Sequence, residues 1–185
     1  MTIMIIGLLL WVVLHLFKRF SPRVRYDLSV IFGQDIPKGT LAILIILGLV
    51  MIIFGYLHAS FQPIYEPPSW GGVVAAALMF LALLLAGSSM SKTLFYSKTR
   101  HPLLMATSLW SLAHLLSNGD LASALLFGTL GFWALLQMSL ISLQDDVWIK
   151  PAKSTPKQDL FLLLGVCLVY AAIFGLHYNL GHSPF

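Results

Sequence analysis

The sequence has little charge and almost no cysteine. Of its 185 residues, only 10% are Asp, Glu, Lys or Arg, whereas 58% are hydrophobic and the mean hydropathy is +0.88. A soluble domain carries about 25% charged residues, so this composition excludes a soluble cytosolic domain. The single cysteine, Cys167, lies inside an apolar run. An intramolecular disulfide and a pair of thiolate metal ligands are therefore excluded as well.

Negative charge is scarcer than positive charge, and the formal net charge is +4. A nucleic-acid-binding domain needs a basic face in water. Here the basic residues stand in the short stretches between apolar runs. The sequence therefore predicts no nucleic-acid partner, and the predicted partner is the lipid bilayer.

Six apolar runs each approach the roughly 17 to 25 residues that a helix needs to cross a bilayer. They cover residues 2–17, 41–60, 71–90, 102–117, 121–143 and 159–178. No internal repeat or long linker divides the chain, and Lys18 and Arg19 follow the first run rather than precede it, which indicates a retained helix. The predicted fold is all-α: a polytopic integral membrane bundle of six transmembrane helices in a single domain over residues 1–185.

The basic residues predict the topology of this bundle, because short loops rich in Lys and Arg stay on the cytoplasmic face. All eleven lie in the alternate stretches 18–40, 91–101 and 144–158, and both chain ends lack them. The prediction is six spans with both termini outside the cytoplasm.

The fourth run carries a polar face. Its members fall within an arc of roughly 60° on a helix of 3.6 residues per turn, and they are Arg100, Thr107, Ser111, His114 and Asn118. For the two hydroxyl residues we favour hydrogen bonds to the preceding turn. For His114, packing against a neighbouring helix and a ligand or catalytic role both stay open, since polar groups in hydrocarbon are costly. Beyond this face, Asn118-Gly119-Asp120 predicts a tight turn with Asp120 capping the next helix.

The other histidines fall into two layers by depth. His101 and His114 are about 20 Å apart at 1.5 Å per residue, too far to share one metal ion. His114 matches His58 or His177 in depth, and His101 matches His15. Gly48, Gly55 and His58 share one face of the second helix, where missing side chains allow a bulky partner or another helix to approach; contact with a helix is the commoner use.

These motifs together resemble the NnrU family of bacterial membrane proteins. The most specific block runs from Leu109-Trp110-Ser111 through His114 to Asn118-Gly119-Asp120. Further matches are His15, Ser21-Pro22-Arg23-Val24-Arg25, Gly33, Pro67-Pro68-Ser69-Trp70, Arg100-His101-Pro102 and Phe127-Gly128. The family is associated with nitrite and nitric oxide reduction in denitrifying bacteria. It is also similar to 15-cis-zeta-carotene isomerase, a membrane enzyme that uses haem b.

The resemblance implies a haem b site with His114 as an axial ligand of the iron. It makes His15 the expected second ligand, although the depth count separates the two, and His58 is an alternative. His101 is a further candidate for binding the cofactor. Asp120 is one of the polar residues expected to support the site. The isomerase has a cysteine at the position of Ser111, and a hydroxyl is a poor substitute for thiolate on haem iron.

The leading hypothesis is therefore a multi-pass protein of the bacterial inner membrane that serves nitrite or nitric oxide reduction, with haem b as candidate cofactor. One alternative is a haem-dependent isomerase of a carotenoid-like polyene, which would make a lipid-soluble substrate its partner. Another is a non-catalytic factor that assembles a membrane reductase. The Arg100-His101-Pro102 segment also resembles membrane methyltransferases, but their downstream arginine pattern is absent.

Overall fold

A computed structural model describes residues 1–20, 38–91, 93–145 and 147–180. In these residues the secondary structure consists of seven helices. They are α1 (Thr2–Phe20), α3 (Lys38–Leu57), α4 (Gly71–Ser91), α5 (Leu94–Lys98), α6 (Pro102–Ser117), α7 (Leu121–Gln144) and α8 (Pro156–Asn179). The predicted all-α class is confirmed, and each predicted run coincides with one long helix.

Four of the helices are long and apolar enough to cross a membrane: Gly39–Leu57 in α3, Gly71–Met90 in α4, Leu121–Gln144 in α7 and Pro156–Asn179 in α8. The apolar stretches Thr2–Phe17 of α1 and Pro102–Ser117 of α6 are shorter. Large apolar side chains of α3, such as Ile43, Ile46 and Val50, point away from the bundle and are exposed. The chain is therefore a multi-pass membrane protein.

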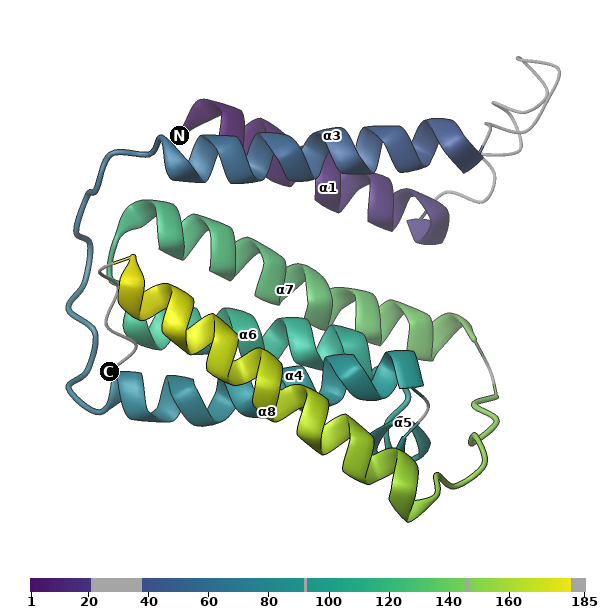
Figure 1. Ribbon diagram of the computed structural model, residues 1–185. Helices are drawn as coiled ribbons and strands as arrows, with labels where there is room; N and C mark the ends of the chain where they lie inside the picture. Colours follow the sequence, from purple (N-terminus) through teal and green to yellow (C-terminus); the bar gives the residue numbers. More distant parts are fainter. Residues whose placement is uncertain (21–37, 92, 146, 181–185) are drawn as a thin grey trace, which may run out of the picture.

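The long helices pack in the order α3, α1, α7, α6, α4 and α8, so that α6 lies between α7 and α4 (Figure 1). Successive long helices run in opposite directions (Figure 1). One end of the bundle holds the described basic residues outside the apolar stretches, and we call it the basic end; those with described side chains are Arg19, Lys98, Arg100, Lys150, Lys153 and Lys157. The start of α1 and the end of α8 lie together at the other end (Figure 1). Arg23, Arg25, Gly33 and Lys92 lie outside the described residues.

Glycines bring α1 and α3 into close contact. A Cβ atom added to Gly7 would lie 2.7 Å from the carbonyl oxygen of Gly48 and 2.8 Å from the nitrogen of Ile52. A Cβ on Gly55 would overlap the backbone of Met4. The helix that approaches the Gly48 and Gly55 face, as the sequence predicts, is α1.

The segment 58–70 is fastened to the α6–α7 turn at the end opposite the basic end. Ile64 N–H donates to the Gly119 carbonyl at 2.8 Å, and Leu121 N–H donates to Gln62 at the same distance. The Asp120 carboxylate accepts from Ser123 N–H at 3.0 Å and caps α7, which confirms the predicted cap. These bonds fix the start of α7 and the end of α6, where the cavity described next begins.

Candidate functional site

A cavity of about 770 Å³ lies between α4, α6 and α8, with one residue each from α3 and α7. Ligand sites in proteins commonly have volumes of about 300–1,000 Å³ and apolar walls with a few polar groups. This cavity follows that pattern: aromatic and aliphatic side chains form most of its wall, and the imidazoles of His114 and His177 both line it. Ser117 and Asn118 add polar groups near the end of α6.

His114 is held in one orientation by its own helix and by α7. Its ring stacks on Phe127 with ring centroids 4.3 Å apart and planes at 20°. Its Nδ1 lies 2.9 Å from the carbonyl oxygen of Trp110. A carbonyl only accepts, so Nδ1 must carry the proton and donate. The neutral ring then keeps its lone pair on Nε2, the nitrogen available to a metal or a hydrogen-bond donor.

His177 of α8 has the same local arrangement. Its Nδ1 lies 2.9 Å from the carbonyl oxygen of Ile173 and must also be the protonated nitrogen. The structure therefore brings two imidazoles, on α6 and α8, to one cavity, each with its Nδ1 bonded to a carbonyl of its own helix. Of the two residues that match His114 in depth, His177 lines this cavity and His58 does not.

The remaining candidate histidines lie elsewhere. His58 is exposed and packs against Phe54, with ring centroids 4.2 Å apart and planes tilted by 33°. His15 lies at the α1–α7 interface, where its ring centroid is 4.3 Å from that of Trp11 and 5.0 Å from that of Trp133. His101 precedes α6 at the basic end. The structure does not bring His15, His58 or His101 into the cavity with His114.

The five residues of the predicted polar face have different surroundings in the structure. Thr107 donates to the Leu103 carbonyl at 3.0 Å, as expected for an intrahelical hydroxyl. The same expectation is wrong for Ser111, whose hydroxyl is buried and has no hydrogen-bond partner among the described residues. Ser111 packs instead against Gly131 of α7, where an added Cβ would lie 3.0 Å from the serine Cβ. Of the five residues of this polar face, His114 and Asn118 line the cavity. The face is divided because one part of it meets the cavity and another part meets α7.

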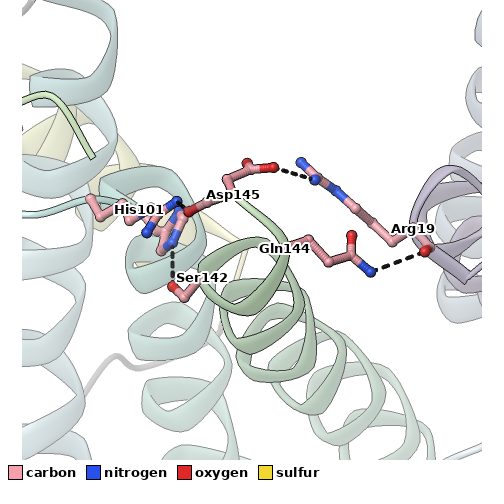
Figure 2. A network of polar contacts seen from close by, with 6 residues as sticks. Arg19, His101, Ser142, Gln144 and Asp145 are labelled. Carbon is pink, nitrogen blue, oxygen red and sulfur yellow. Dashed lines mark hydrogen bonds and ion pairs between the residues drawn. The ribbon is translucent and has the colours of Figure 1, made fainter. Parts of the chain in front are cut away.

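A second polar cluster lies at the basic end (Figure 2). The Arg19 guanidinium forms an ion pair with the Asp145 carboxylate at 3.0 Å, and Gln144 Nε2 donates to the Arg19 carbonyl at 3.1 Å. Arg100 donates to the Asp145 carbonyl at 2.6 Å, and His101 Nε2 lies 3.0 Å from the Ser142 hydroxyl. The cluster ties α1 and the start of α6 to the end of α7. Burial, with smaller effects of Arg100 and Arg19 that Asp145 partly opposes, lowers the pKa of His101.

The described residues contain no group of three or more His, Cys, Asp or Glu side chains that could hold a metal ion. The family model described as NnrU protein matches residues 3–184. The chain belongs to the NnrU family. No curated protein and no solved structure gives a significant match to it.

Two tyrosines of this NnrU protein that were not among the predicted site residues also line the cavity. Tyr170 of α8 lines the cavity and donates to the Ala76 carbonyl at 3.2 Å. Tyr56 of α3 lines it too, and its hydroxyl lies 2.9 Å from that of Ser123. Tyr170 and His177 stand seven residues apart, a spacing that places them on one face of a helix. The spacing could not indicate that α8 packs against α4 and lines one cavity with α6.

Proposed function

We propose that this NnrU protein crosses the bacterial inner membrane six times, with both chain ends outside the cytoplasm. The described basic residues outside the apolar stretches gather at one end of the bundle, as positive-inside sorting requires. The short apolar helix α6 packs between α7 and α4. Its neighbours therefore shield its ends from lipid, which makes a 16-residue helix acceptable as a span.

The cavity binds haem b in this proposal, with His114 and His177 as the iron ligands. The supporting observation is that both imidazoles line one cavity while Nδ1 of each is engaged by its own helix. The volume of about 770 Å³ and the aromatic wall fit a large planar cofactor, and imidazole is a common haem ligand. His177 thus takes the place that the resemblance suggests for His15. Bound haem would supply one-electron redox chemistry.

The residues around the imidazoles prepare them for this role. The Trp110 and Ile173 carbonyls fix the tautomer that leaves Nε2 free, and such a second hydrogen bond raises the basicity of a histidine ligand. The Phe127 ring restrains His114 from one side, and the apolar wall limits access of water. The process served is nitrite or nitric oxide reduction, in keeping with the family's association. Ser111 is not an iron ligand in this proposal, because its hydroxyl is buried against Gly131 outside the cavity lining.

Visible spectra of the purified protein test the haem site. Protein expressed with added haem should have a Soret band and reduced-minus-oxidised bands after dithionite. His114→Ala and His177→Ala should each lose or shift these bands, because each removes one ligand. His58→Ala is the matched control and should keep the wild-type spectrum, since His58 is exposed outside the cavity.

Two outcomes contradict the haem proposal. One is the absence of a Soret band in well-folded wild-type protein, judged by a single symmetric peak in gel filtration. The other is a wild-type spectrum in His114→Ala.

A further inference from the structure

A second concavity lies on the outer surface of the bundle beside the cavity. It is a shallow groove of about 420 Å³ lined by Ala76, Ala77, Phe80 and Leu81 of α4 and by Tyr170 of α8. All of these side chains are apolar except the Tyr170 hydroxyl, which bonds the Ala76 carbonyl. Both helices are long, apolar candidate spans. The groove therefore faces the hydrocarbon of the bilayer.

The groove and the cavity share two residues, Ala76 and Tyr170. The Tyr170 ring packs edge-on against Phe80, with centroids 5.6 Å apart, and its hydroxyl donates to Ala76 at 3.2 Å. Three consecutive alanines of α4, residues 75–77, form this part of the seam and have only methyl side chains. Tyr170 is thus the one large side chain shared by the lipid-facing groove and the cavity.

The seam between α4 and α8 is tight toward the basic end and open toward the other. A Cβ on Gly87 would lie 2.6 Å from Leu162 and 3.7 Å from Val166, which is buried. Farther along, Met79 of α4 and Ile173 of α8 both line the cavity. Val166, beside the Gly87 contact, is the one residue of α8 that is buried. A helix anchored at one half and weakly packed at the other can admit a molecule along its open half.

We propose that the groove seats the hydrocarbon chain of a bilayer-dissolved molecule, and that this molecule enters the cavity sideways between α4 and α8 past Tyr170. A hydrocarbon chain loses nothing by leaving lipid for this apolar groove, whereas a water-soluble ion would forfeit its hydration without gaining a partner. Opening requires the Tyr170 ring to turn and to give up one hydrogen bond. The proposal depends on the cavity and the groove, and it holds with or without a bound haem.

Cysteine labelling in proteoliposomes tests this entrance. In a Cys167→Ser background, Ala113→Cys places a thiol in the cavity wall at a side chain only 1% exposed. Leu112→Cys places one at the adjacent, outward-facing position and calibrates reactivity in lipid. The probes are N-dodecylmaleimide dissolved in the bilayer and a sulfonated maleimide in water. The dodecyl probe should label Ala113→Cys, and the sulfonated probe should label it more slowly.

Tyr170→Phe keeps the ring and removes the bond to Ala76. The net strength of one hydrogen bond corresponds to about fivefold in the opening equilibrium, so the dodecyl probe should react with Ala113→Cys about that much faster. Tyr170→Ala should accelerate it further, and both variants should leave the Leu112→Cys rate unchanged, which also verifies folding. Faster labelling by the sulfonated probe, or an Ala113→Cys rate indifferent to both Tyr170 variants, would overturn the proposal. Soret absorbance is recorded separately, so loss of haem and loss of the entrance are distinguishable.

Discussion

The His101 ring lies among positive charges at the basic end. Burial is the largest cause that lowers its pKa from the ordinary value of 6.5; Arg100 and Arg19 also lower it, and Asp145 opposes them. In the unfolded chain the ring takes up a proton near pH 6.5, but in the folded protein it does so only at lower pH. Its contribution to stability is therefore complete above pH 6.5 and is lost as the pH falls through the folded-state pKa.

We predict that His101→Gln reduces the loss of thermal stability on acidification. Gln keeps a polar side chain able to bond Ser142, the present partner of His101, but it does not titrate. The measurement is the unfolding midpoint in detergent at pH 7.5 and at pH 5.5 for wild type and variant. The wild-type midpoint should fall more than that of the variant, since other titrating groups are common to both. Equal falls would show that His101 does not contribute.

At the scale of helices, the α1–α3 pair depends on absent side chains. We predict that Gly7→Ala destabilises the protein by about 1–3 kcal/mol, as overpacking does elsewhere. The new methyl group would meet backbone atoms of Gly48 and Ile52 rather than a flexible side chain. Gly165→Ala in α8 is the control, because nothing lies within 4 Å of its added Cβ. That change should raise stability by about 0.5–1 kcal/mol through helix propensity.

Chemical unfolding in mixed micelles gives both free energies. If Gly7→Ala and Gly165→Ala changed the free energy of unfolding equally, helix propensity would account for both changes. That result would contradict close packing at Gly7.

The helices themselves were predictable from sequence, but their neighbours were not. Apolar runs locate each long helix, and local signals mark some starts: Asp120 caps α7 and Pro102 begins α6. Such signals act over a few residues. The Arg19–Asp145 pair joins residues 126 apart, and no local pattern indicates it. Likewise, Ser111 and His114 share a helix face but have different neighbours, because only packing decides which part of an arc meets α7 and which meets a cavity.

At the scale of the whole molecule, the two ends differ in charge. The described Lys and Arg side chains lie at the basic end, whereas the segment 58–70 carries one acidic residue, Glu66, and no basic one. Antiparallel packing of successive helices brings loops that are far apart in sequence to the same end (Figure 1). The charge asymmetry along the sequence thereby becomes a charge asymmetry between the two ends of the bundle, from which the positive-inside rule predicts the orientation in the membrane.

This asymmetry predicts which loops face the cytoplasm. In a Cys167→Ser background, Ser60→Cys places a thiol in the segment opposite the basic end, and Ala152→Cys places one in the loop before α8; both positions are exposed. A membrane-impermeant maleimide applied to intact spheroplasts should label Ser60→Cys, and it should label Ala152→Cys only after lysis. The reverse labelling pattern would mean that the protein has the opposite orientation in the membrane. Labelling of both thiols in intact cells would mean that the chain does not separate its two ends by a bilayer. Three long helices, α4, α6 and α7, separate Ser60 from Ala152, and α8 crosses once more after Ala152. A tag at residue 185 should therefore share the accessibility of Ser60→Cys.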